Sequence, residues 1–252
     1  MHRSSENRLT RLDAFKSVAF RKADFQANLD GIGRKIGGAY SFDLCLMTGS
    51  STNRASMTLM SYNAAMASPL SFDLHGLLPP GDYEFTFEEL RRSLLVKGPG
   101  RADSNWDTAW RESLVGNLEV MTRQLWQAGI RDVFADGSFV EEKDHPNDID
   151  GYFVCALADL ASGDLIRRLN LLDPYKIWTW DPRSRQAFRG YPKKQLPMWH
   201  RYRVELYPHV AGFFSGIRDL QGNELEFPSA FRQSRRDGRP RGIIKLKSGE
   251  PT

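Results

Sequence analysis

Residues 134–154 read FADGSFVEEKDHPNDIDGYFV, in which two apolar runs flank a polar segment. The first run ends at Gly137 and Ser138, and the second begins with Asp148 and Asp150. Successive side chains of a strand point to opposite faces, so the two aspartates share one face, about 7 Å apart. Such a pair can bind Mg²⁺, which prefers hard oxygen ligands at short distance. The stretch therefore predicts two strands, a turn between them and a metal site on the second strand.

The turn at Gly137 and Ser138 adds a second chemical feature. Gly137 lets the backbone turn tightly and approach a ligand, and Ser138 supplies a hydroxyl. If a helix follows the turn, its free N–H groups form a seat for a phosphate. Each motif alone also has an ordinary explanation, because Gly-Ser is common in turns and Asp-x-Asp at polar strand ends. Together the two motifs indicate phosphoryl or nucleotidyl transfer.

The composition is that of a globular protein. With 252 residues, 40% of them hydrophobic, the chain can form one domain with an appendage or two small domains. Two cysteines, Cys45 and Cys155, make neither a disulfide framework nor a zinc site. The N-terminus is polar rather than signal-like, and no apolar run reaches the ~18 residues of a membrane span. We expect a cytoplasmic protein without a membrane partner.

The first 65 residues differ from the rest of the chain. Between Asp43 and Asp73 the only charged residue is Arg54, in a stretch rich in Ser, Thr, Asn, Met and Ala. The apolar residues of this stretch show only weak periodicity, and such a composition is typical of a poorly ordered segment. We predict a weakly ordered extension over residues 1–65, with one candidate helix over residues 13–29. The functional domain is expected over residues 66–252, and Met66 is an alternative start of the protein.

Beyond Met66 the pattern predicts helices alternating with strands. Thr86 and Glu89 form a capping box that opens a helix to about Val96, and residues 106–125 carry an apolar helical face that ends near Gly129. The tryptophans on this face are interpreted as core. A further helix is expected over residues 164–171, and strands over residues 131–135, 148–156, 176–180, 202–207 and 242–247. This order predicts a mixed α/β fold with a sheet flanked by helices.

Gly137-Ser138 followed by Asp148-Ile149-Asp150 resembles the signature of the nucleotidyltransferase superfamily, which includes DNA polymerase β-like and minimal bacterial nucleotidyltransferases. In that signature Gly-Ser opens a helix, and Asp-hydrophobic-Asp lies on the next strand. The LLPPG turn at residues 77–81 and DGRPRGIIKL at residues 237–246 look like one bacterial branch. Its relatives often belong to toxin–antitoxin or phage-defence loci. The resemblance spans about residues 74–247.

The resemblance implies transfer of NMP from an NTP such as ATP, dependent on Mg²⁺ or Mn²⁺, with pyrophosphate leaving. Gly137 and Ser138 would contact the triphosphate, and Asp148 and Asp150 would hold the metal. A third carboxylate on a later strand is usual in the family. Glu205 is the candidate here, as a ligand and as a base toward the acceptor hydroxyl. The implied acceptor is RNA (tRNA) or a protein, and an antitoxin is a candidate partner.

Other residues have two interpretations. Glu205 can equally be a strand residue paired with Arg203, because alternation places both on one face. Residues 232–247 carry seven Lys or Arg residues against one acid, Asp237. This segment is either a solvated face or a contact for nucleic acid or phosphate. Its candidate contact residues are Arg232, Arg235, Arg236, Arg239 and Arg241.

His145 precedes Pro146 in a loop, where it is expected to be solvated and its spacing does not place it for metal binding. His200 and His209 lack a Ser or Cys partner motif, so packing or surface positions are expected for them. The competing function is that of a non-catalytic protein, nucleotide-binding or antitoxin-like, that retains the fold. Nucleotide hydrolysis would use the same site. The sequence does not separate hydrolysis from transfer.

Overall fold

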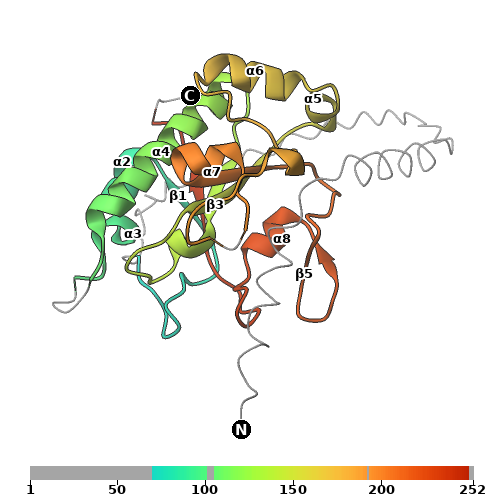
Figure 1. Cartoon of the computed structure of the whole chain (residues 1–252). Helices are drawn as coiled ribbons and strands as arrows, with labels where there is room; N and C mark the ends of the chain where they lie inside the picture. The colour runs from blue at the N-terminus through green and yellow to red at the C-terminus, as the bar shows by residue number, and fades with distance from the viewer. Residues whose placement is uncertain (1–69, 101–104, 192, 250–252) are drawn as a thin grey trace, which may run out of the picture. The chain divides into compact units, whose positions relative to one another are not determined.

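The computed structural model describes residues 70–100, 105–191 and 193–249 (Figure 1). The expected N-terminal extension, the candidate helix over residues 13–29 and the alternative start at Met66 lie outside these ranges. The described part contains a mixed α/β fold, as predicted, built on a five-stranded sheet.

The sheet has the order β1-β7-β2-β3-β4. Its strands are β1 (Asp82–Phe85), β2 (Val133–Asp136), β3 (Ile149–Val154), β4 (Val204–His209) and β7 (Ile243–Leu246). β2 is antiparallel to both of its neighbours, β7 and β3, whereas β1 pairs parallel with β7 and β3 pairs parallel with β4. β2, which precedes the Gly137-Ser138 turn, is therefore the central strand, and β3, which follows Asp148, lies next to it. A separate two-stranded sheet joins β5 (Ile217–Arg218) and β6 (Glu224–Leu225).

Helices flank the sheet (Figure 1). α4 (Thr108–Gln127) is the longest described helix, and it contacts α6 (Asp164–Leu172), α7 (Pro197–Tyr202) and the edge strand β4. α8 (Phe227–Phe231) packs with Phe134 and Tyr152 in an apolar cluster on one sheet face. The remaining described helices are α2 (Phe87–Arg92), α3 (Leu94–Lys97) and α5 (Leu157–Ala161), with 3-10 turns η1 (Gly137–Val140) and η2 (Pro182–Ser184).

Local signals in the sequence account for several helix ends. The predicted capping box is confirmed, since the Glu89 N–H donates to the Thr86 hydroxyl and the Thr86 N–H donates to the Glu89 carboxylate. The helix does not run unbroken to Val96, because Ser93 adopts an extended conformation that ends α2 and caps α3. α4 begins after Asp107, whose carboxylate accepts from the Trp110 N–H.

Two predicted strands differ from the structure. Residues 176–180 form no strand, because the side-chain amide of Asn170 satisfies the Trp178 backbone: the Trp178 N–H donates to Oδ1 at 3.0 Å, and Nδ2 donates to the carbonyl at 2.8 Å. β4 begins at Val204 rather than Tyr202, because Tyr202 ends α7 and Arg203 follows in the left-handed region at φ 55°. Within the described ranges, every helix falls short of what a bilayer crossing requires.

Candidate functional site

Three carboxylates lie side by side across three adjacent strands. Asp136 of β2 is the register partner of Asp150 of β3, and Asp150 is the register partner of Glu205 of β4. Register partners point to the same face of a sheet, so the three form one row. Asp136 and Glu205 are fully buried, and the Asp150 side chain is 11% exposed. The tertiary structure thus brings Glu205 next to Asp150, although the two residues lie 55 positions apart in the sequence.

The next level of the same face is apolar. Phe134, Tyr152 and Tyr207 are register partners one pleat further along the strands. Tyr207 stacks on Phe227 of α8, and Tyr152 packs against Phe231. α8 therefore covers the sheet beside the carboxylate row, and the row lies at the border of this apolar cluster.

Gly137 directly follows Asp136 and passes close to Asp150. It adopts φ +80°, and a Cβ placed there would lie 3.0 Å from Asp150 Oδ2. Both facts favour glycine, because other residues avoid this backbone region and no side chain fits against the carboxylate. The expected helix after Gly-Ser is absent: η1 is a four-residue 3-10 turn, and Ser138 within it is half-buried. A turn this short does not provide the helix N-terminus that was expected to seat a phosphate.

Asp148 lies just before β3, and its carboxylate is oriented by a tryptophan. The indole Nε1 of Trp199 donates to Asp148 Oδ2 at 2.7 Å, and both residues are buried. The Arg235 guanidinium lies 3.8 Å from Asp150 Oδ2, with 37% of its side chain exposed. Both aspartates of the predicted motif are therefore positioned by the fold.

Glu205 is held by hydrogen bonds from its own neighbourhood. The Leu196 N–H donates to Oε1 at 3.2 Å, the Tyr207 hydroxyl donates to Oε2, and Arg185 lies 3.5 Å from Oε1. Burial and the adjacent Glu205 charge raise the pKa of Tyr207 well above its usual value, so this hydroxyl keeps its proton. Arg203 does not pair with Glu205. Its guanidinium instead lies over the Trp199 ring at 3.8 Å.

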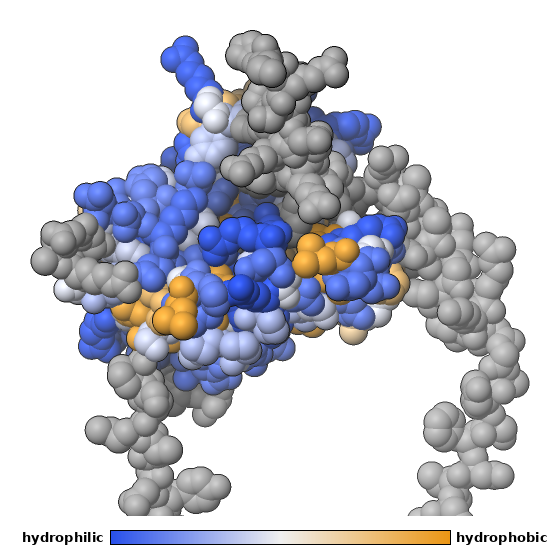
Figure 2. Space-filling model, turned by 90° about the horizontal axis from the view of Figure 1, so that it is seen from below, coloured by the Kyte–Doolittle hydropathy of each residue, from blue (hydrophilic) through white to orange (hydrophobic). Residues whose placement is uncertain are grey.

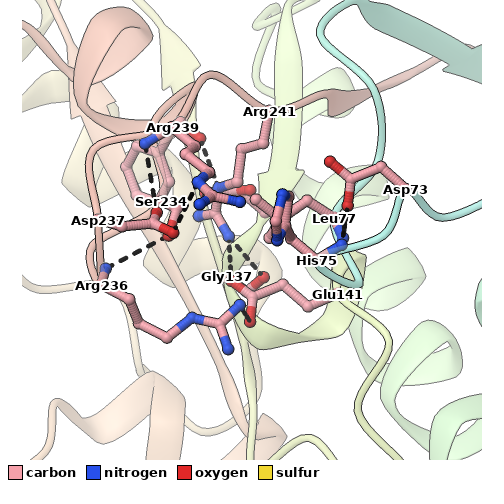
Figure 3. Close-up of polar contacts among 12 residues, drawn as sticks. Asp73, His75, Leu77, Gly137, Glu141, Ser234, Arg236, Asp237, Arg239 and Arg241 are labelled. Atoms are coloured by element: carbon pink, nitrogen blue, oxygen red, sulfur yellow. Dashed lines mark hydrogen bonds and ion pairs between the residues drawn. The ribbon is translucent and has the colours of Figure 1, made fainter.

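The C-terminal basic segment folds against the Gly137 turn. Figure 3 shows Arg236 and Arg241 converging on Glu141, with Arg239 beside Asp237. Arg241 is 3% exposed and also bonds Asp136 Oδ2 at 2.5 Å. The loop containing these arginines lies at the bottom of Figure 1, and the face seen from below in Figure 2 is largely hydrophilic. Arg232 lies apart from this group and pairs with Asp82 at 2.7 Å.

Each acid of this carboxylate row thus lies near one arginine from a segment outside the sheet. Asp136 faces Arg241, Asp150 faces Arg235, and Glu205 faces Arg185. Burial raises the pKa of Asp136 to about 7, although Arg241 acts in the opposite direction. Oδ1 of Asp136 is buried without a hydrogen-bond partner. Buried carboxylates need such cations, since an uncompensated charge inside a protein is costly.

The donor set suits a divalent cation held by two protein carboxylates. Asp148 and Asp150 supply hard oxygen ligands, and the missing side chain at Gly137 keeps space beside Asp150 Oδ2. Mg²⁺ commonly takes one or two carboxylates and completes its shell with water and substrate phosphates. Across residues 70–100, 105–191 and 193–249, no three Asp, Glu, His or Cys side chains are grouped to hold one metal ion. A third ligand role for Glu205 would require it to exchange its present partners.

Sequence reasoning missed four residues that shape the site. Asp136 carried a usable signal, because it ends an apolar run directly before Gly-Ser, on a strand that forms a hairpin with the aspartate strand. Tyr207 carried one as well, because strand alternation places it on the same face as Glu205, two residues away. Trp199 and Arg185 carried none, since their contacts with Asp148 and Glu205 join segments that lie apart in the chain. Of the histidines, His145 is exposed and ring-stacked on Trp110, whereas His209 is buried.

Comparison with known proteins places the chain in a family. Residues 70–247 match the model of a family described as a family of unknown function, DUF6932. The chain belongs to this family. No curated protein and no solved structure matches the chain. The DUF6932 region contains the whole described sheet and every residue of the candidate site, so the carboxylate row is part of the family domain.

Proposed function

We propose that the DUF6932 domain is a nucleotidyltransferase that moves NMP from an NTP to a hydroxyl of RNA or protein. The observation that carries the proposal is the position of Asp150, which lies beside Gly137, two positions after Asp148 and next to Glu205. The Gly-Ser and Asp-x-Asp resemblance to nucleotidyltransferases supports it. In this reaction the acceptor oxygen bonds to the α-phosphorus, the bond to the β-phosphate breaks, and pyrophosphate leaves.

Each residue of the site would have its own role in this reaction. Asp148 and Asp150 would hold Mg²⁺ or Mn²⁺, which when bound neutralises the phosphates and lowers the pKa of the acceptor hydroxyl. Trp199 fixes the orientation of Asp148 through its 2.7 Å hydrogen bond. The backbone at Gly137 and the hydroxyl of Ser138 would contact the triphosphate. Glu205 is the candidate third ligand and base, once the Tyr207 hydroxyl releases it.

The arginines differ in their suitability for phosphate contact. Arg235 has 37% of its side chain exposed beside Asp150, and Arg236 has 65% exposed. Arg235 is therefore the arginine placed to meet an anion next to the metal site, whereas Arg236 lies 3.7 Å from Glu141. Arg241 is buried between Asp136 and Glu141, so its guanidinium would position the Gly137 turn rather than meet a ligand. Arg239, 44% exposed, lies further out against Asp237.

A label-transfer assay tests this proposal. The full chain is incubated with each α-³²P-labelled NTP, Mg²⁺ or Mn²⁺, and either total tRNA or cell lysate. We expect label on one acceptor class with wild type and none with the Asp148→Asn, Asp150→Asn double variant. The matched control is Asp159→Asn with Asp164→Asn, two partly exposed acids of α5 and α6, which should transfer as wild type does. Labelled free NMP without acceptor labelling would indicate hydrolysis instead. No label under any condition, or equal label in both double variants, would overturn the proposal.

A second candidate function is nucleotide binding without transfer, as in a sensor or an antitoxin-like protein. The specific observation that favours it is Glu205, whose carboxylate oxygens accept hydrogen bonds from Leu196 and Tyr207. A site with only two available carboxylates can bind a metal–nucleotide complex without activating an acceptor. Calorimetric binding of an NTP with Mg²⁺, in a protein that transfers no label, would select this candidate.

A further inference from the structure

A basic hairpin is attached to the carboxylate site at both of its ends. We define it as residues 186–191 and 193–195. Gln186 and Gln195 close it by exchanging backbone hydrogen bonds of 2.9 and 2.8 Å. Arg185 precedes the hairpin and Leu196 follows it, and both contact Glu205. The residues that flank the hairpin on both sides therefore contact the carboxylate row.

The charge of this region has a single sign. Between Asp181 and Glu205 the sequence contains seven Lys or Arg residues and no Asp or Glu. Within the hairpin, Arg189 and Lys194 are exposed and Lys193 is half-buried. A cluster of cations attracts a polyanion, most strongly when the charges of the polyanion are closely spaced along a chain.

Aromatic rings lie among these cations. Phe188 and Tyr191 of the hairpin pack edge-on against Trp199, with ring centroids 5.2 and 4.7 Å away. The Arg203 guanidinium lies between neighbouring rings, 3.8 Å from the Trp199 centroid and 4.2 Å from that of Phe188. Phe188 remains 38% exposed although it packs on these partners. An exposed aromatic ring beside cations is the arrangement on which unpaired nucleobases stack.

The aromatic cluster is also joined to the candidate metal site. Trp199, at its centre, donates its indole N–H to Asp148. We propose that the basic hairpin and the ring of Phe188 bind a single-stranded nucleic acid, with its phosphates on Arg189, Lys193 and Lys194. This deepens the proposed function and rests on it for one point only, that the bound strand is the acceptor. Bases of a duplex are stacked inside the helix, so the exposed Phe188 ring fits a single strand.

Fluorescence anisotropy with labelled 12-nucleotide oligomers tests the proposal. The protein carries Asp148→Asn and Asp150→Asn, so the measurement does not depend on transfer. We expect single-stranded oligomers to bind more tightly than a duplex of the same length. Replacing Arg189 and Lys194 by Ala should reduce the slope of log K against log salt by about 1.4, from ~0.7 per lost phosphate contact. Phe188→Ala should weaken binding roughly 5- to 100-fold and leave the salt slope unchanged.

The matched control is Arg92→Ala with Lys97→Ala, two exposed cations of α2 and α3, of which α2 contacts the opposite edge strand β1. It should bind as the parent does. No binding of single strands, equal loss in the control variant, or a preference for the duplex would overturn the proposal. Equal competition by poly-glutamate would also overturn it, because it would indicate an acidic protein partner. Binding to the hairpin in a protein that labels no acceptor would retain this inference and reject transfer.

Discussion

Asp150 and Glu205 are register partners on the parallel strands β3 and β4, although they lie 55 positions apart in the chain. Their side chains share one sheet face with Asp136, which pairs with Asp150 from the other side. Like charges this close are tolerated only with compensation. Here each acid faces an arginine: Arg241 and Arg235 come from residues 232–241, and Arg185 from the segment before α7, so the site depends on how these two segments fold over the sheet.

Gly137 should tolerate no side chain. Gly137→Ala forces an L residue to φ +80° and places its Cβ 3.0 Å from Asp150 Oδ2. We expect a loss of more than about 2 kcal/mol of unfolding free energy and loss of metal-dependent nucleotide binding. Urea denaturation and calorimetry measure these. The control is Gly163→Ala, at φ +74° with open space around it, which should cost about 1–2 kcal/mol and leave binding intact. Equal behaviour of the two variants would contradict the close approach to Asp150.

Replacing Arg235 should mainly lower nucleotide affinity, whereas replacing Arg241 should mainly lower the free energy of unfolding. At about pH 8, above the Asp136 pKa of about 7, Arg241→Ala leaves a buried carboxylate without its cation, which should cost about 3–5 kcal/mol. Arg235→Ala removes a partly exposed side chain 3.8 Å from Asp150 and should cost less than about 1 kcal/mol. Nucleotide affinity should nevertheless fall with Arg235→Ala. Denaturation curves and nucleotide titrations of both variants provide the comparison, and an unchanged affinity in Arg235→Ala would remove Arg235 from the site.

Glu205 should affect Mn²⁺ binding less than Asp150 does. Leu196, Tyr207 and Arg185 hold the Glu205 carboxylate in the fold. We expect Glu205→Gln to lower the unfolding free energy by about 1–3 kcal/mol, since a buried hydrogen-bonded group is perturbed. Electron paramagnetic resonance of Mn²⁺ compares its affinity in Glu205→Gln and Asp150→Asn. Equal losses of affinity would instead establish Glu205 as the third ligand.

Asp136 should make stability depend on pH. Its pKa is about 7 in the fold because burial raises it from 3.8, so the folded state holds a proton that the unfolded state releases. This stability is complete below about pH 4 and is lost as pH rises through about 7. The unfolding free energy of wild type should therefore fall relative to Asp136→Asn between pH 5 and pH 8, by a few kcal/mol. Asp132→Asn changes an exposed neighbouring acid, so its unfolding free energy should vary with pH as that of wild type does. If the unfolding free energy of Asp136→Asn varied with pH as that of wild type does, the raised pKa of Asp136 would be contradicted.

Local patterns in the sequence predicted much of the fold. The Thr86–Glu89 capping box, the apolar face of α4 and the apolar runs that flank the Gly137-Ser138 turn are patterns among residues close together in the chain. The prediction failed at residues 176–180, where β-like composition was overridden by the Asn170 side chain. It also failed after Ser138, where a 3-10 turn takes the place of the expected helix.

The sequence by itself determined the α/β fold class, the tight turn at Gly137 and the shared position of Asp148 and Asp150 near the start of β3. Only the tertiary structure decided what surrounds them. Glu205 and Asp136 join the row through strand pairing, Arg241 through a buried ion pair and Trp199 through a hydrogen bond to Asp148. The reason is physical: period-2 alternation is readable along one strand, whereas strand order and loop docking depend on the burial of distant segments together.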